Sequence, residues 1–465
     1  MSEALKVVSP IDGSVVGTLP TQDVPAVDAA YSKLSAAQPA WAERPAVERG
    51  ELLRTAAQSL REAASELGEL LVREIGKTPK EAVDEVVRSA DMIDFTVDQA
   101  ISSPRLTDYE IPAEEFPGTP PGRVQTVTRV PLGVVLAIAP FNYPVNLAVS
   151  KIAPALMMGN TVLFKPPSQG GVAGRRMVEL FYAAGLPEDA LAVITGRSSV
   201  IGERLVTHPA MAMVSLTGSN QTGEQIAKQA GMVPLMMELG GNDPAIVLAD
   251  ADLKLAAENV AKGAFKYAGQ RCTAVKRVYV VETVAEEFTN LLVAQVGEHF
   301  GSAGDPREHP VGPVIDDKQA DYLAELLADA TAAGGTVRSG GNRDGRVFEA
   351  TVIDGLDHSA RLVAEEQFGP LLPVVRVKDA AEAVRLANDT PYGLQASVFT
   401  ADVPLAESLA RQIKAGGVHL NGPDQRGPDN FMFVGHKASG LTPQGVRFAL
   451  EGMSTLKGIV HNPSA

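Results

Sequence analysis

Residues 133–167 read GVVLAIAPFNYPVNLAVSKIAPALMMGNTVLFKPP, and this stretch decides the fold. An apolar run over 134–139 predicts a buried strand, and a second apolar run over 161–165 predicts another. The segment between them, residues 144–158, is apolar and stops at Gly159, as helices commonly do. Two buried strands joined through a helix indicate a parallel pair, because parallel strands require a crossover connection.

The same alternation of strand, turn and helix continues toward the C-terminus. It predicts further helices over 175–184, 202–207, 253–267, 317–333 and 380–388. It predicts further strands over 191–195, 211–216, 245–248, 277–281, 372–377, 397–400 and 418–421. This pattern is typical of doubly wound parallel sheets, so we predict an α/β fold whose two lobes meet near Gly240 and Gly241.

The regions before this alternation have a different character. Residues 45–101 show helical periodicity that breaks near Gly76. Residues 102–128 contain prolines, glycines and the run VQTVT, which predicts an edge hairpin or a projecting arm. Residues 1–45 predict little beyond a short entry punctuated by proline and glycine.

Composition and charge exclude several classes of protein. The chain has 465 residues and a formal net charge of −15 at pH 7, which argues against nucleic acid or an anionic membrane surface as a partner. The N-terminus lacks the apolar core of a signal peptide. The uncharged segment 131–150 is interrupted by prolines and asparagines, which argue against a membrane span. With a single cysteine as well, we expect a cytoplasmic protein without an intrachain disulfide.

That single cysteine, Cys272, lies in the stretch Gly269-Gln270-Arg271-Cys272. A thiolate is a nucleophile, and the neighbouring Arg271 would favour the ionised form. The alternative is a small buried hydrophobe, which is the more common role of a lone cysteine. This stretch alone leaves both interpretations open.

Polar residues also follow two other apolar strands. Glu238 ends an apolar run, and carboxylates are rare in such strands without a role or a partner. A partly desolvated glutamate can serve as a general base. Asn142 lies between two prolines after the strand 134–139, where a rigid amide could donate to an oxyanion or simply stabilise a turn.

A further group of residues suggests a cofactor site. Lys165 and Ser168 follow the strand 161–165 at the edge where open α/β sheets bind ligands, and they suit a ribose or a phosphate. The alternative is a strand-end lysine whose ammonium reaches solvent. Gly218 and Ser219 form a turn between a strand and a helix, which could bind an anion through backbone N–H groups. The Gly-x-Gly-x-x-Gly spacing is absent there, so a plain turn is an equal alternative.

An ordered set of motifs, which extends over nearly the whole chain, resembles the aldehyde dehydrogenase superfamily. The motifs are Pro140-Phe141-Asn142-Tyr143-Pro144, Phe164-Lys165-Pro166-Pro167, Thr217-Gly218-Ser219, Glu238-Leu239-Gly240-Gly241, Gly269-Gln270-Arg271-Cys272 and Glu365-Glu366-Gln367-Phe368-Gly369-Pro370. Residues 269–277 and 425–431 are similar to the branch of non-phosphorylating, NADP-dependent glyceraldehyde-3-phosphate dehydrogenases. Two departures are His436, which is unusual, and Ser168, where the branch often has threonine.

The resemblance implies roles for individual residues. The nucleophile would be Cys272, the general base Glu238 and the oxyanion donor Asn142, assisted by the backbone N–H of Cys272. Cofactor contacts would come from Lys165, Ser168, Gly218, Ser219, Glu366 and Phe368. The substrate and its phosphate would be held by Arg88, Tyr143, Arg271, Thr273 and Arg426, and no metal is expected.

The implied reaction is the NADP-dependent oxidation of glyceraldehyde 3-phosphate to 3-phosphoglycerate, without phosphorylation. NAD would be the weaker cofactor. Another anionic aldehyde, such as succinic semialdehyde, is the nearest alternative substrate. A CoA-acylating relative is disfavoured because Glu238 is present. An inactive structural or binding protein on the same scaffold is the alternative from a different class.

The resemblance also implies a domain organisation and a partner. We expect a homo-oligomer, either a dimer or a tetramer. The expected parts are a cofactor-binding domain over 1–105 and 128–243, a catalytic domain over 244–424, an oligomerisation arm over 106–127 and 448–465, and a return segment over 425–447.

Overall fold

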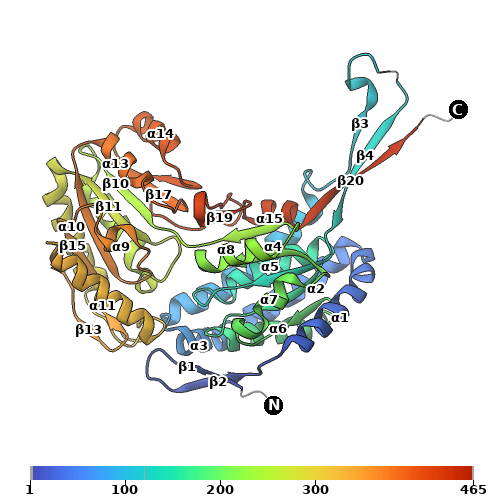
Figure 1. Cartoon of the computed structure of the whole chain (residues 1–465), viewed down its shortest axis with the longest axis horizontal. Coiled ribbons are helices and arrows are strands. Elements are labelled where there is room, and N and C mark those ends of the chain that lie inside the picture. The colour runs from blue at the N-terminus through green and yellow to red at the C-terminus, as the bar shows by residue number, and fades with distance from the viewer. Residues whose placement is uncertain (1–3, 120, 463–465) are drawn as a thin grey trace.

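The computed structural model describes residues 4–119 and 121–462 of the chain. Residues 1–3, 120 and 463–465 lie outside the described residues, including the first residues of the expected cofactor-binding domain and the last of the expected arm. Figure 1 shows two α/β lobes side by side and a narrow β-arm that projects from one of them.

Six strands form the first sheet within the described residues, in the order β19-β9-β8-β5-β6-β7. They are β5 (Val134–Ile138), β6 (Thr161–Lys165), β7 (Leu191–Val193), β8 (Met211–Thr217), β9 (Leu235–Glu238) and β19 (Gly440–Leu441). Strands β5 to β9 are parallel, and only β19 runs antiparallel to its neighbour. The stretch 133–167 supplies β5, β6 and the helix α5 (Asn146–Met157) between them, which confirms the predicted parallel pair.

Helices cover both faces of this sheet (Figure 1). They are α1 (Val24–Glu43), α2 (Ala46–Glu62), α3 (Ala64–Ile75), α4 (Pro79–Ser102), α5, α6 (Gly171–Ala183), α7 (Ser198–Thr207), α8 (Asn220–Gln229) and α15 (Val446–Gly452). The region 45–101 is three helices, since the chain breaks at Ala63 as well as at Gly76. The sequence pattern of residues 1–45 did not predict α1 or the hairpin of β1 (Leu5–Val8) with β2 (Val15–Leu19).

The second sheet has seven strands among the residues described, in the order β12-β15-β16-β11-β10-β17-β18. They are β10 (Asp243–Val247), β11 (Val275–Val281), β12 (Thr336–Ser339), β15 (Thr351–Asp354), β16 (Leu371–Val377), β17 (Gln395–Phe399) and β18 (Gly417–Leu420). Its helices are α9 (Leu253–Phe265), α10 (Glu282–Phe300), α11 (Asp317–Ala332), α12 (Arg361–Ala364), α13 (Ala380–Asn388) and α14 (Val403–Gln412). All pairs except β12 with β15 are parallel, so the predicted second lobe is confirmed.

The arm is a sheet of three strands, β3 (Tyr109–Pro112), β4 (Val124–Pro131) and β20 (Ser454–His461). It joins the predicted hairpin at 102–128 to the far C-terminal segment of the chain (Figure 1). Short elements elsewhere are η1 (Ala113–Glu115), η2 (Lys266–Gly269), η3 (Lys437–Ser439) and the hairpin β13 (Arg343–Asp344) with β14 (Val347–Phe348). In the described part of the chain, no helix has the length and apolarity that crossing a membrane requires.

A buried ion pair lies beneath the junction of the two lobes. The ammonium of Lys77 pairs with Glu85, and both side chains are almost completely buried. The other carboxylate oxygen of Glu85 accepts hydrogen bonds from the backbone N–H groups of Val145, at 3.0 Å, and Asn146, at 3.1 Å. The pair therefore fixes α4 to the start of α5, which follows the turn that contains Asn142.

We expect Lys77→Met to lower the free energy of unfolding by about 3–5 kcal/mol, because the charge of Glu85 would stay buried without its cation. Lys80→Met is the matched control, since Lys80 pairs with Asp84 on the same helix but both side chains are exposed. That control should not change stability measurably. Denaturant unfolding of both variants measures the difference, and equal midpoints would contradict the role of the buried pair.

Candidate active site

The first sheet brings several polar residues to one edge. Strands β5, β6, β8 and β9 are parallel neighbours, so their carboxyl ends lie together. Lys165 is paired in register with Ile138, and Glu238 with Thr217. Asn142 follows β5 in the adjoining turn. The structure thus assembles at one sheet edge three of the residues that the sequence analysis singled out.

The loop that carries Cys272 comes from the second lobe. The predicted helix 253–267 ends at Phe265, because Tyr267 and Ala268 take left-handed backbone angles with φ of 53° and 50°. Gly269 follows with φ of 69°, and a Cβ atom there would lie 2.4 Å from the carbonyl oxygen of Gly369. The chain therefore reverses sharply and delivers Cys272 to the lobe junction just before β11.

The thiol of Cys272 lies next to the carboxylate of Glu238. Its Sγ donates to Glu238 Oε1 at 3.4 Å. Glu238 is 1% exposed, and its Oε2 accepts from Thr217 Oγ1 at 3.3 Å and forms an ion pair with Arg426. A nucleophile and a base in direct contact, with the base oriented by further groups, is the arrangement that covalent catalysis requires.

The structure corrects the expectation that Arg271 favours the thiolate. Burial raises the pKa of the Cys272 thiol, and the negative charge of Glu238 raises it further. Lys276 and Arg426 act in the opposite direction but do not reverse the shift. The guanidinium of Arg271 instead donates to the carbonyl oxygen of Gly263, away from the sulfur. Glu238, in contact with the sulfur, is the group placed to take the proton of the thiol.

Asn142 bridges the two lobes at the same place. Its Nδ2 donates to the carbonyl oxygen of Gln270 at 3.0 Å, and its side chain is buried. The amide has a second N–H, which remains for another acceptor. Among the described residues, the backbone N–H of Cys272 donates no hydrogen bond. Two donors are thus available beside the sulfur, as an oxyanion site requires.

Lys151 belongs to this cluster, although the sequence analysis missed it. Its Nζ donates to Thr217 Oγ1 at 2.7 Å, and Thr217 donates to Glu238. Burial lowers the pKa of Lys151 to about 7. The available signal was a lone charge inside the apolar helix α5, because buried lysines are rare without a partner or a role.

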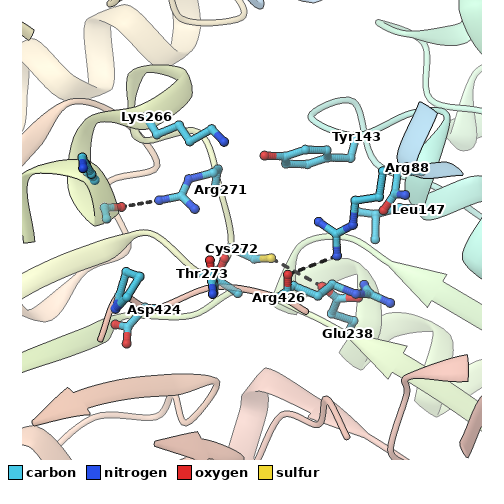
Figure 2. A pocket seen from close by; sticks show the side chains of 15 residues that line it. Arg88, Tyr143, Leu147, Glu238, Lys266, Arg271, Cys272, Thr273, Asp424 and Arg426 are labelled. Carbon is cyan, nitrogen blue, oxygen red and sulfur yellow. Dashed lines mark hydrogen bonds and ion pairs between the residues drawn. The ribbon is translucent and has the colours of Figure 1, made fainter. Parts of the chain in front are cut away.

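A cavity of about 290 Å³ opens above the sulfur. It is lined by all five residues predicted to hold the substrate together with Cys272 and Glu238 (Figure 2); the five are Arg88, Tyr143, Arg271, Thr273 and Arg426. Arg88 comes from α4, in a different lobe from Arg271, so distant parts of the chain meet here. The cavity therefore combines a nucleophile on its floor with several cations around it.

Two of these arginines already have acidic partners. Arg88 donates to both carboxylate oxygens of Asp429, at 3.0 and 2.9 Å. Arg426 pairs with Glu238, and its guanidinium lies 5.1 Å from the centre of the Phe433 ring. Arg426 thus contacts the candidate general base directly, which its sequence position did not indicate.

The residues predicted to bind a cofactor lie along the sheet edge and across the lobe junction. Lys165 is 9% exposed at the end of β6, and Ser168 is exposed on the wall of a second cavity of about 800 Å³. The Ser219 hydroxyl caps α8 by accepting from the Thr222 N–H, and the Gly218 N–H donates to the Glu238 carbonyl oxygen at 3.1 Å. Hydrogen bonds therefore fix Gly218 and Ser219 at the start of α8.

Glu366 and Phe368 reach the same junction from the second lobe. Glu366 accepts from the backbone N–H of Gly241 at 3.1 Å and pairs with Lys276 at 3.3 Å. A Cβ atom at Gly240 would lie 2.2 Å from Glu366 Oε2, so glycine permits this close approach. The Phe368 ring lies edge-on to Phe141, which adjoins Asn142, with 5.9 Å between ring centres.

Among the described residues, no group of three or more histidine, cysteine or acidic side chains is arranged to hold a metal ion. The site combines the Cys272 thiol, the carboxylates of Glu238 and Asp424, the Asn142 amide, the buried Lys151 and several cations. These groups can perform acyl transfer through a covalent sulfur intermediate.

Comparisons with known proteins agree with this geometry. The NADP-dependent glyceraldehyde-3-phosphate dehydrogenase of Streptococcus equinus is 43% identical over 459 residues, which cover 98% of this chain and 95% of that protein. The enzyme of the same name from Pisum sativum is 40% identical, over 94% of this chain and 87% of that protein.

A solved structure matches closely as well. The NADP-dependent glyceraldehyde-3-phosphate dehydrogenase of Bacillus halodurans C-125, complexed with NADP, superposes with a TM-score of 0.97 at 44% identity, covering 100% of this chain and 96% of that one. The model of the aldehyde dehydrogenase family matches residues 1–459. With the fold, the thiol and carboxylate in contact, and these matches in agreement, the chain belongs to the aldehyde dehydrogenase family.

Proposed function

We propose that this protein oxidises glyceraldehyde 3-phosphate to 3-phosphoglycerate with NADP⁺ and without phosphorylation. The observation that carries the proposal is the cavity of about 290 Å³, whose wall combines Cys272 and Glu238 with three arginines and a tyrosine. A thiol and a carboxylate suit aldehyde oxidation, and the cations suit a phosphorylated substrate. The relatives of Streptococcus equinus and Pisum sativum are named NADP-dependent glyceraldehyde-3-phosphate dehydrogenases.

The residues divide the reaction between them. Glu238 takes the proton of Cys272, and the sulfur attacks the aldehyde carbon to form a thiohemiacetal. Asn142 Nδ2 and the Cys272 N–H donate to the oxyanion, and one such donor is typically worth about 3 kcal/mol. Loss of a hydride then leaves a thioester. Glu238 then releases its proton to solvent and takes a new one from a water molecule, which attacks the thioester, so that the acid is released and Cys272 leaves as the thiolate.

The residues at the sheet edge fit NADP⁺, which when bound accepts the hydride. The residue Lys165 is 9% exposed, and burial lowers the pKa of its ammonium. The ammonium has no hydrogen-bond or ion-pair partner in the described structure. A cation held this way is ready to bind ribose hydroxyls or a phosphate. Ser168 adds a hydroxyl on the cavity wall without a repelling charge.

Glu238→Gln should separate the two halves of the reaction. The amide cannot take a proton from water in the second half of the reaction. In the first half, removal of the Glu238 charge lowers the pKa of the Cys272 thiol, so the thiol can lose its proton to solvent, and hydride loss itself needs no base. We expect a burst of about one NADPH per active site, followed by a steady rate lower by about 10²–10⁴-fold. Rapid mixing with product absorbance measures both phases, and Cys272→Ala is the control that should show neither. An unchanged steady rate in Glu238→Gln would show that another base activates water.

Tyr143→Phe should test whether the Tyr143 hydroxyl binds the phosphate of the substrate. The substitution removes a hydroxyl that faces the cavity but keeps the ring, which lies over the Lys77 ammonium at 3.4 Å. A hydrogen bond to a charged group contributes about 1.5–3 kcal/mol, so kcat/KM for glyceraldehyde 3-phosphate should fall by about 10- to 150-fold.

Glyceraldehyde and succinic semialdehyde, assayed with the same variant, are the controls. Oxidation of glyceraldehyde should be almost unaffected, because it has no phosphate for Tyr143 to contact. A wild-type preference for succinic semialdehyde over glyceraldehyde 3-phosphate would overturn the proposed substrate. Arg426→Ala is a poorer probe than Tyr143→Phe, because Arg426 also contacts Glu238.

Ser168→Glu should weaken the binding of NADP⁺ by at least about tenfold, since a carboxylate would repel the 2′-phosphate at close range. Binding of NAD⁺ should change little, because NAD⁺ lacks that group. Ser168→Gln is the neutral control of nearly equal size. Fluorescence titration of each variant with both cofactors measures the effect, and equal losses for the two cofactors would place Ser168 away from the 2′-phosphate.

A further inference from the structure

Lys266 stands at the mouth of the substrate cavity, outside the set of residues predicted to hold the phosphate. It lies where α9 ends and η2 begins, and it lines the same cavity as Tyr143, Arg271 and Cys272. Figure 2 shows its side chain extended above Arg271, with the ammonium directed into the space that the Tyr143 hydroxyl also faces. Its position follows from the sharp turn at Tyr267, which ends the helix and turns the chain toward the cysteine.

The partners of the cations around this cavity differ. Arg88 is engaged with Asp429, and Arg426 with Glu238. Lys262 also lines the cavity, one helical turn earlier, but it pairs with Glu258 at 2.6 Å. In the described structure the ammonium of Lys266 has no hydrogen bond or ion pair.

Arg271, the neighbour of Lys266 in the cavity, is also incompletely satisfied. Its side chain is 8% exposed, and its buried Nε has no hydrogen-bond partner in the described structure. One of its terminal nitrogens donates to the Gly263 carbonyl oxygen. The second terminal nitrogen of Arg271, the Lys266 ammonium and the Tyr143 hydroxyl are therefore donors that remain for an incoming anion, and all three residues line this cavity.

We infer that Lys266 is a specificity-determining residue that binds the substrate phosphate together with Arg271 and Tyr143. This inference rests on the proposed function, since it assigns a further contact to the same substrate. A phosphate monoester carries a charge of about −1.5 to −2 at pH 7, so a single arginine does not neutralise it. Lys266 supplies a second cation without first breaking an ion pair.

The contribution of Lys266 should be moderate, because the residue is exposed and water screens its charge. We expect Lys266→Met to lower kcat/KM for glyceraldehyde 3-phosphate by about 5- to 20-fold and to leave oxidation of glyceraldehyde unchanged. Lys266→Arg should retain most of the wild-type rate. Lys262→Met is the matched control, since it removes a cation from the same helix and cavity that is already paired.

Inhibition by glycerol 3-phosphate, with glyceraldehyde as the substrate, provides a second readout that does not depend on turnover of the phosphorylated aldehyde. Lys266→Met should raise the inhibition constant by a similar 5- to 20-fold, and Lys262→Met should leave it near the wild-type value. Equal inhibition constants in wild type and Lys266→Met would overturn the inference. An equal rise of the inhibition constant in Lys262→Met would also overturn the inference, because it would indicate that the positive charge of the cavity as a whole, and not a contact with Lys266, binds the phosphate.

The same measurements separate this inference from the proposed function. If wild type shows no preference for glyceraldehyde 3-phosphate over glyceraldehyde and no inhibition by glycerol 3-phosphate, the proposed substrate is wrong and the inference falls with it. If wild type shows both, and Lys266→Met retains both undiminished, only the role of Lys266 is wrong.

Discussion

The ammonium of Lys77 holds together the two loops on which the site depends. It pairs with Glu85 and lies 3.4 Å from the centre of the Tyr143 ring and 5.0 Å from that of Tyr267. Tyr143 belongs to the turn that carries Asn142, and Tyr267 to the loop that delivers Cys272. One buried cation thus contacts both the turn that carries Asn142 and the loop that carries Cys272. A cation between two aromatic faces is strongly stabilised only when it is desolvated, as it is here.

The sequence predicted the elements well where local patterns determine them. The parallel strands β5, β6 and β8 follow from short apolar runs between prolines and glycines, and their shared edge follows from topology. The end of α9 at Phe265 was not predictable, because Tyr267 and Ala268 take left-handed angles that their side chains do not favour. Contacts with distant residues impose this backbone, among them the bond of 2.9 Å from the Tyr267 hydroxyl to the Ile75 carbonyl oxygen.

The sequence predicted which residues form the candidate site, but not which side chains within it contact one another. Motif order indicated Cys272, Glu238 and Asn142, and the structure brings them together. It did not indicate that Arg271 turns to Gly263 while Arg426 reaches Glu238, because side-chain direction depends on packing across the two lobes. The place of Lys151 in the site was not predictable for the same reason, since its contact is with Thr217, which lies 66 positions away in the sequence.

Several cations lie around the Cys272 thiol, although the protein has a formal net charge of −15. Two of them form ion pairs with acidic side chains, Arg88 with Asp429 and Arg426 with Glu238. Each acidic partner limits the repulsion among the arginines, yet Glu238 also raises the pKa of Cys272. Arg426 offsets both effects, since it neutralises Glu238 and lowers the pKa of the thiol. An anion that binds Arg426 must share it with Glu238, so an anion in the cavity and this carboxylate compete for one guanidinium. Arg88 and Arg426 are therefore shared with acidic side chains of the protein, whereas Lys266 and Arg271 form no ion pair among the described residues.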